Sequence, residues 1–267
     1  MKMTFRWYGE RDLIPLEYIR QIPNMSGVVT AVYDCPVGGR WSAASVNGLK
    51  ARAAGAGLEM CVIESVPVHE DIKLGKPSRD GYIDNYIVNI KTLADAGVQC
   101  ICYNFMPVFD WLRTDLKAPA ADGSNSLLFD DAEMRRLDPK SLSLPGWDES
   151  YTKEELNGLL GEYRSVSHGK LFENLVYFLN KIMPVCGETG VDMAIHPDDP
   201  PWDIFGLPRI IADESDLDRL FATVPDKHNG LTFCSGSLGA GRFNDLVKLA
   251  GKYAGAGRIK FAHLRNI

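Results

Sequence analysis

No apolar run in the 267-residue sequence is long enough to cross a membrane. The first ten residues, MKMTFRWYGE, contain neither the apolar segment nor the small-residue cleavage site of a secretory signal. No run of five Lys or Arg occurs either, and the formal net charge is -6. These absences predict a cytoplasmic protein that binds neither a membrane nor nucleic acid. A small anionic ligand is still compatible, because a few local cations in a pocket are sufficient.

A C-x-x-C pair is also absent, although the sequence contains six cysteines. Several of the six lie inside apolar runs. This placement favours reduced, buried thiols over a disulfide framework. The cysteines are Cys35, Cys61, Cys100, Cys102, Cys186 and Cys234.

Short apolar runs separated by helical segments repeat along the chain. The runs are nearly continuous rather than alternating, which is typical of strands buried on both faces of a parallel sheet. They predict strands at 4–9, 27–34, 58–65, 98–105, 191–197, 231–237 and 259–266. Helical spacing and terminal glycines predict helices at 45–57, 84–97, 170–190, 213–224 and 243–257. The alternation of strand and helix predicts an α/β protein.

The predicted fold is a TIM (β/α)8-type barrel forming a single domain over residues 1–267, with only seven strands evident. An open doubly wound sheet is the alternative, but no G-x-G-x-x-G follows the first strand. A long insertion, 106–169, follows the fourth strand and is expected on the C-terminal face. There it is expected to form a lid or a subunit contact. An inert surface excursion is the equally weighted alternative.

Within this insertion the sequence predicts one helix and two loops. Thr152, with Glu155 three residues later, is typical of a capping box at the start of TKEELNGLLGEYR. Pro, Gly, Asp and Ser are concentrated at 118–126 and 138–150, which indicates loop.

Three candidate metal ligands lie near the ends of three successive strands. His196 ends the fifth strand, and Cys234 and His263 lie in the sixth and seventh. Barrel chemistry is located at the carboxyl ends of the strands, and neighbouring strands lie about 4.8 Å apart, so these side chains can meet at one ion. One His or Cys alone is more often a packing residue. Together, the three predict a site for zinc, iron or manganese.

Other polar side chains fall at the same edge. Each has an ordinary alternative as a capping, solvated or core residue. The candidates for binding a polyol are Trp7, Tyr8, Glu64, Asn104 and Asp199. His69, followed by Glu70 in the loop after the third strand, is the in-chain candidate for acid–base catalysis. Asp198 and Asp199 are candidates for orienting metal ligands, and Arg209 and Arg265 for pairing with a carboxylate.

Several segments resemble the D-mannonate dehydratase family. They extend from one end of the chain to the other, in order. The matching segments are FRWYG (5–9), VTAVYDCPVG (29–38), VIESVPVHEDIK (62–73), CYNFMPVFDW (102–111), LPGWD (144–148), MAIHPDDPPWDIFGLPRI (193–210) and HLRN (263–266).

The resemblance implies a TIM barrel of the xylose-isomerase-like kind and a hydro-lyase activity. The expected reaction is dehydration of D-mannonate to 2-keto-3-deoxy-D-gluconate, with Mn²⁺ or Fe²⁺, in hexuronate catabolism. By this resemblance His196, Cys234 and His263 correspond to family metal ligands. Together with the long insertion, it also suggests a homodimer.

The sequence departs from the family pattern at one point. Family members continue beyond HLRN to an Asp-His-Gly segment, whose Asp is the fourth ligand and whose His, with a later Tyr, is a candidate acid–base group. None of these occurs in the 267 residues. A chain that ended at Ile267 is therefore expected to bind metal weakly and to turn over little. Two alternatives stay open: a metal-dependent sugar isomerase or epimerase on the same barrel, and an inactive truncated form, such as a non-catalytic metal- or sugar-binding barrel.

Overall fold

A computed structural model describes residues 1–139 and 151–267 of the chain. The family-like segment LPGWD (144–148) and most of the loop expected at 138–150 lie outside the described residues.

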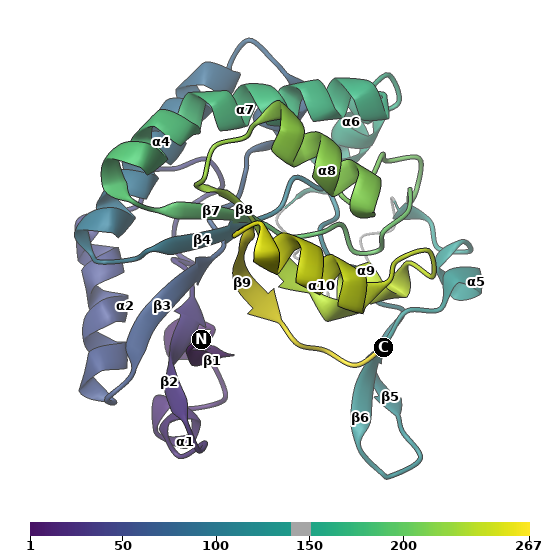
Figure 1. Cartoon of the computed structure of the whole chain (residues 1–267). Helices are drawn as coiled ribbons and strands as arrows, with labels where there is room; N and C mark the ends of the chain where they lie inside the picture. The colour runs from purple at the N-terminus through teal and green to yellow at the C-terminus, as the bar shows by residue number, and fades with distance from the viewer. Residues whose placement is uncertain (140–150) are drawn as a thin grey trace.

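Seven parallel strands form one curled sheet (Figure 1). Their order in the sheet follows the order of the chain, β1-β2-β3-β4-β7-β8-β9, and every neighbouring pair is parallel. The strands are β1 (Met3–Arg6), β2 (Met25–Thr30), β3 (Glu59–Glu64), β4 (Cys100–Tyr103), β7 (Asp192–Ile195), β8 (Asn229–Cys234) and β9 (Ile259–His263). All seven expected strands are therefore present, each beginning within two residues of its predicted start, and each is shorter than predicted. Because the strands are parallel, their carboxyl ends share one edge of the sheet.

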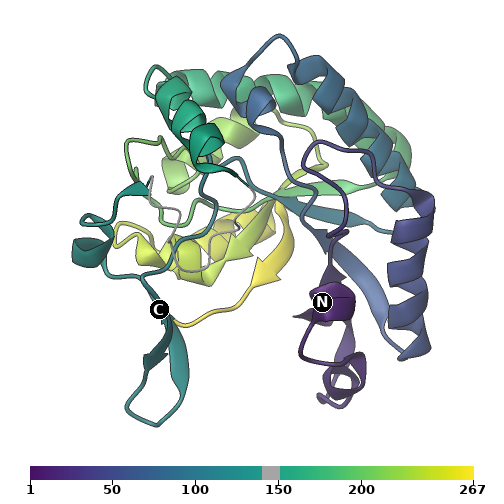
Figure 2. The same cartoon turned by 180° about the vertical axis from the view of Figure 1, so that it is seen from behind.

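Helices follow the strands and pack on the outer, convex side of the sheet, as the two opposite views show (Figures 1 and 2). The helices are α1 (Leu16–Arg20), α2 (Ala43–Gly55), α3 (Glu70–Leu74), α4 (Arg79–Asp95), α5 (Asp131–Met134), α6 (Lys153–Tyr163), α7 (His168–Thr189), α8 (Glu214–Thr223), α9 (Ser235–Ala240) and α10 (Leu246–Gly255), with a 3-10 turn at Gly9–Arg11. The five helices expected between strands correspond to α2, α4, α7, α8 and α10. The short α1, α3, α5 and α9 are absent from the sequence prediction.

Helix α7 shows how the sequence specifies these elements. Ser167 caps its first turn by accepting a hydrogen bond from the backbone N–H of Lys170, and Gly190 ends it in the left-handed conformation, with φ of 74°. Its apolar residues recur every three or four positions and are buried, so one face of the helix packs on the sheet. The residues of this face include Leu171, Leu175, Phe178, Leu179 and Ile182.

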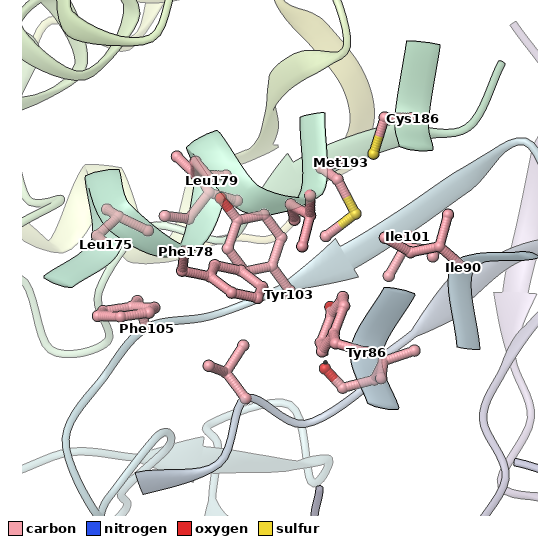
Figure 3. Packing of buried hydrophobic residues seen from close by; sticks show 14 of the residues in the cluster. Tyr86, Ile90, Ile101, Tyr103, Phe105, Leu175, Phe178, Leu179, Cys186 and Met193 are labelled. Carbon is pink, nitrogen blue, oxygen red and sulfur yellow. Dashed lines mark hydrogen bonds between the residues drawn. The ribbon is translucent and has the colours of Figure 1, made fainter. Parts of the chain in front are cut away.

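The largest core lies between the sheet and the outer helices. Tyr103 of β4 and Phe178 of α7 meet with ring centroids 6.0 Å apart, and Tyr86 of α4 packs edge-on against Phe178 (Figure 3). A second, smaller cluster lies on the inner face of the sheet and includes Val29, Val62 and Cys102. With apolar side chains on both faces, the central strands match the continuous hydrophobic runs of the sequence.

The segment after β4 differs from the expected loop. Residues 118–126 lie within a β-hairpin, formed by β5 (Asp115–Pro119) and β6 (Asn125–Leu128), that projects away from the sheet (Figure 1). The predicted capping box is present, because Thr152 and Glu155 each accept a backbone hydrogen bond from the other at the start of α6. Leu156 and Leu160 of α6 belong to a separate hydrophobic cluster that also contains Leu207, from the segment after β7. The insertion is thus packed against the chain that follows His196.

Two further expectations from composition can be compared with the structure. In the part of the chain that is described, all six cysteines are free thiols, and four of them are buried. Among the described residues, no helix has both the length and the apolar character needed to span a bilayer.

Candidate metal centre

Three successive strands place the predicted metal ligands at one edge of the sheet. His196 directly follows β7, and its backbone N–H continues the ladder by donating to the Tyr103 carbonyl at 2.7 Å. Cys234 is the last residue of β8 and is paired in register with His263, the last residue of β9. The parallel ladder therefore brings these three side chains together.

The three side chains converge closely enough to hold one ion. Their ligand atoms all lie within 4.8 Å of one another, with Cys234 buried and both histidines partly buried. The imidazole centroids of His196 and His263 are 5.2 Å apart. The Nδ1 atom of His196 lies 2.6 Å from the Pro197 carbonyl oxygen; donation of a proton to that oxygen leaves Nε2 as the ligand atom.

Cys234 lies among hydrogen-bond donors. Its Sγ accepts from Nη2 of Arg265 at 3.0 Å and from the backbone N–H of Ser237 at 3.4 Å, in the first turn of α9. Burial by itself raises the pKa of this thiol, but hydrogen bonds with His196 and His263, and the charges of His196 and Arg265, lower the pKa to about 4. The sulfur is therefore held as a thiolate, the form that binds metal.

Glu64, the last residue of β3, meets His263 of β9 across the inner face of the curled sheet. Its Oε2 lies 3.2 Å from Nε2 of His263 and 3.1 Å from Nη1 of Arg6. Burial tends to raise the pKa of Glu64, but the hydrogen bond and charge of His263 and the charge of Arg6 lower the pKa to about 2. Burial tends to lower the pKa of His263, whereas hydrogen bonds with Cys234 and Glu64 raise it to about 9.

Asp199 connects the cysteine to the insertion. Its two oxygens each accept from Arg113 at 3.1 Å, and Oδ2 also accepts from Ser237 at 3.0 Å and from Arg265 at 3.2 Å. Ser237 and Arg265 are the same residues that contact the Cys234 sulfur. Asp199 therefore does not contact the Cys234 sulfur itself. It orients Ser237 and Arg265, which donate hydrogen bonds to that sulfur.

The other predicted sugar-binding residues are more dispersed. Trp7 is buried in a cluster with Ile19 and Val28, as a core aromatic is, whereas Tyr8 is 58 % exposed. Asn104 follows β4, and its side-chain oxygen accepts from the backbone N–H of Met106. Among the described residues, no hydrogen bond joins these three to the His196–Cys234–His263 group.

His69 lies in a different part of the same edge. It caps helix α3, where Nδ1 accepts from the backbone N–H of Asp71 at 3.1 Å, and its ring stacks on Tyr82 with centroids 3.6 Å apart. It lines a cavity of about 780 Å³ together with Tyr33, Glu70 and residues of α6. Burial lowers the pKa of His69, which favours the neutral ring.

The structure assigns partners to the two remaining arginine candidates. Arg209 is only 4 % exposed and donates to the Phe109 carbonyl at 2.7 Å, while the neighbouring Asp198 accepts from the backbone N–H groups of residues 210 and 211. Arg265 is held by Asp199 and Cys234. Asp198 thus fixes the loop after His196, and Arg209 and Arg265 each have acceptors within the protein for part of their guanidinium.

Sequence reasoning missed Arg6, Arg113 and Ser237. Ser237 had been placed in the sixth strand, although α9 begins at Ser235, directly after Cys234. A small-residue run, SGS, after the strand is the signal for that early helix. Arg113 lies in an insertion without periodicity, and nothing in its sequence neighbourhood indicates Asp199 as its partner.

The donor set fits a divalent ion of borderline softness. Two imidazoles and one thiolate are already within 4.8 Å of one another before any ion is considered. Such donors suit zinc, iron or manganese in preference to calcium or magnesium, which take oxygen ligands.

Comparison with known proteins gives consistent matches across the chain. A family model described as D-mannonate dehydratase (UxuA) matches residues 1–267. Mannonate dehydratase 2 of Halalkalibacterium halodurans is 51 % identical over 269 residues, covering 100 % of this chain and 78 % of the relative. The crystal structure of mannonate dehydratase from Streptococcus suis serotype 2 superimposes with a TM-score of 0.93 at 46 % identity, covering 100 % of this chain and 73 % of that one.

A more distant structural neighbour is 3-keto-D-glucoside 4-epimerase from E. coli, with a TM-score of 0.59 and 12 % identity over 100 % of this chain and 79 % of that one. This similarity shows the fold alone and carries no argument for an epimerase. The seven-strand curled sheet is that of xylose-isomerase-like TIM-barrel enzymes, which confirms the predicted fold class.

Proposed function

Because this chain belongs to the D-mannonate dehydratase family, and its reaction is the dehydration of D-mannonate, we propose that His196, Cys234 and His263 bind the divalent ion that the reaction needs. The single observation that carries this assignment is the convergence of two imidazoles and a thiolate, from three successive strands, within 4.8 Å. Mn²⁺ or Fe²⁺ is proposed as the ion on the family resemblance, since the donor types by themselves suit zinc as well.

The reaction removes a proton from C2 and a hydroxyl from C3 of a sugar acid, giving 2-keto-3-deoxy-D-gluconate. The C2 proton is only weakly acidic, since the adjacent carboxylate is negative. A bound divalent ion would supply Lewis acidity for the substrate oxygens and for the negative charge that develops. The protein must add groups that bind the polyol and groups that move protons.

The residues around the thiolate have positioning roles in this proposal. Asp199 receives Arg113, Ser237 and Arg265, and the last two hold the Cys234 sulfur by hydrogen bonds. Second-layer contacts of this kind fix the orientation and basicity of a metal ligand.

The residues proposed to bind the substrate hydroxyls are those at the same edge of the sheet. Glu64 is held as a carboxylate, since its pKa is about 2, and accepts hydrogen bonds at neutral pH. Position at this edge is the only ground for proposing four further residues as ligands of the substrate hydroxyls: Trp7, Tyr8, Asn104 and Asp199. His69 is proposed as an acid–base group because it lines the large cavity and its ring is held by Tyr82. Since Nδ1 accepts from the Asp71 N–H, Nε2 carries the proton of the neutral ring and is the atom that would exchange a proton with the substrate.

We propose one barrel domain over 1–267 in which the insertion, 106–169, covers the C-terminal edge. Support comes from Arg113, which reaches Asp199 from the insertion, and from the cluster that joins α6 to Leu207. A homodimer is proposed because the hairpin exposes Leu116, Leu127 and Leu128 away from the sheet. A cytoplasmic location fits a sugar-acid enzyme with free thiols.

The metal assignment is tested by metal content and turnover together. The protein is stripped with a chelator and reloaded with Mn²⁺ or Fe²⁺, the bound metal is measured, and 2-keto acid formation from D-mannonate is followed. Cys234→Ala and His263→Ala are expected to lower metal affinity by at least tenfold, since each removes one of three ligands. Cys186→Ala is the matched control, because this thiol is buried behind the sheet in the large core. Unchanged metal content in both ligand variants would refute the assignment.

A further inference from the structure

Arg6, the last residue of β1, is directed to the concave face that contains the metal centre. Its Nη1 lies 3.1 Å from Oε2 of Glu64, and the same oxygen lies 3.2 Å from Nε2 of His263. Glu64 and His263 come from β3 and β9, on opposite parts of the curled sheet, so a carboxylate between them faces the inner side. Arg6 therefore shares this inner side with the ligands.

The guanidinium of Arg6 is only partly satisfied. Its side chain is 28 % exposed, yet Nε and Nη1 are buried and have no hydrogen-bond acceptor among the described residues; Nη1 is close to Glu64 but not aimed along a hydrogen bond. Buried N–H groups of this kind normally have a partner, and leaving one without an acceptor destabilises the folded protein. An acceptor from outside the protein would satisfy them.

In the described part of the chain, the other arginines near the site have fewer such groups or are enclosed: Arg265 leaves only Nε buried without an acceptor, whereas Arg6 leaves both Nε and Nη1. Both terminal nitrogens of Arg113 are bound by the carboxylate of Asp199, and Nη2 of Arg265 is bound by Asp199, Ser237 and Cys234. Arg209 also has buried N–H groups without an acceptor, but it is 4 % exposed and enclosed behind the loop after β7. Arg6 thus has two buried N–H groups without a hydrogen-bond acceptor among the described residues, on a side chain that is 28 % exposed as a whole.

Aromatic rings hold the Arg6 side chain in place. The guanidinium carbon lies 4.9 Å from the ring centroid of Tyr8, and the rings of Tyr8 and Tyr33 are 6.3 Å apart. A cation against an aromatic face is stabilised by the ring and gives up little conformational freedom when it binds a ligand. Tyr33 also lines the cavity of about 780 Å³, although Arg6 itself is not one of its lining residues.

We propose that Arg6 binds the C1 carboxylate of D-mannonate. This inference rests on the proposed metal centre, because it places C1 at Arg6 and C2 and C3 toward His196, Cys234 and His263. A planar guanidinium matches the two oxygens of a carboxylate. It also offsets the negative charge that makes the C2 proton hard to remove, so the contact strengthens as that proton leaves. Arg6 thus determines the preference for an acid over a neutral polyol.

The test compares two ligands that differ at C1. D-Mannonate is the acid, and D-mannitol is the neutral polyol with the same carbon chain. Both are measured on the Mn²⁺-loaded enzyme, the first by its KM and kcat and the second as a competitive inhibitor. Arg6→Gln is expected to weaken D-mannonate binding by about 10- to 100-fold and to lower kcat, while the inhibition constant of D-mannitol changes less than about threefold. Arg6→Lys, which keeps the charge, is expected to recover part of the loss.

Metal content and a surface control separate this role from a structural one. Bound Mn²⁺ is expected to be unchanged in Arg6→Gln, and Arg52→Gln, which removes an exposed ion pair with Glu10, is expected to match the parent in every measurement. The proposal is overturned if Arg6→Gln weakens both ligands equally, or if it keeps the parent's preference for the acid. A separate measurement tests the metal centre: D-mannonate binding to the parent protein is compared with and without Mn²⁺. If binding is the same in both, the proposed metal centre fails, whatever the result for Arg6.

Discussion

Asp199 shows how one residue links stability to the site. It is 6 % exposed and is surrounded by Arg113, Arg265 and Ser237. Burial tends to raise the pKa of Asp199, but the hydrogen bond and charge of Arg113 and the charge of Arg265 lower it below the ordinary value of 3.8. Its carboxylate therefore stabilises the folded state at pH values above that ordinary value, and this contribution is lost as the pH falls through the lower, folded-state pKa.

We predict that Asp199→Asn lowers the free energy of unfolding by about 3 kcal/mol at pH 7, because it leaves two buried or half-buried arginines without their anion. The difference from the parent protein is expected to shrink below about pH 4, where the parent carboxylate begins to be protonated in the unfolded chain. Urea unfolding of both metal-free proteins between pH 3 and pH 7 measures this. A difference that stays constant with pH would contradict the ionic explanation.

The extent to which single residues were predictable differs with the kind of contact. The closeness of His196, Cys234 and His263 could be predicted from sequence, because their position at strand ends is local information and parallel pairing brings strand ends together. Arg6 and Arg113 were not found. Their partners depend on the curvature of the sheet and on the path of the insertion, which no periodicity encodes.

At the scale of elements, helix α6 depends on its first turn. Thr152 and Glu155 form a reciprocal capping box, and the buried face of the helix is short, with Leu156, Leu160 and Tyr163. We predict that Thr152→Ala costs about 1 kcal/mol of unfolding free energy, because one backbone N–H at the helix start loses its acceptor. Thermal or urea unfolding measures it. Thr152→Ser serves as the control and is expected to stay within a few tenths of a kcal/mol of the parent.

The sequence did not predict the β5–β6 hairpin, because its strands lack the hydrophobic pattern of buried strands. Its strands are almost entirely exposed, so DLKAP and NSLL contain no alternation of apolar and polar residues. The turn between them, Ala120 to Ser124, contains Asp122 and Gly123, and Gly123 has φ of 85°. Asp-Gly is a hairpin signal by itself. The core strands were predicted because burial on both faces leaves a strong hydrophobic pattern, which a surface hairpin does not need.

At the scale of the whole molecule, the hairpin offers a test of the proposed homodimer. Leu116 and Leu127 are 40 % and 49 % exposed on an element that projects from the body. We predict that the double variant Leu116→Asp, Leu127→Asp shifts a dimer toward monomer, because charges in an apolar contact are left without water or a partner. Sedimentation velocity measures this, with the unfolding temperature expected to change little. Val247→Asp, at another exposed apolar position, is the control. A double variant that remains fully dimeric would exclude the hairpin as the contact.

The order of the strands in the sheet has a consequence for how the protein is made. The contact between Glu64 and His263 joins residues 199 positions apart, and Arg6 is tied to the same carboxylate. During synthesis the N-terminal strands emerge from the ribosome long before β9 does. Until then Cys234 lacks His263 and Arg265, so a nascent chain holds no thiolate of this kind. The complete set of contacts around Cys234 can therefore form only after residue 265 has been synthesised.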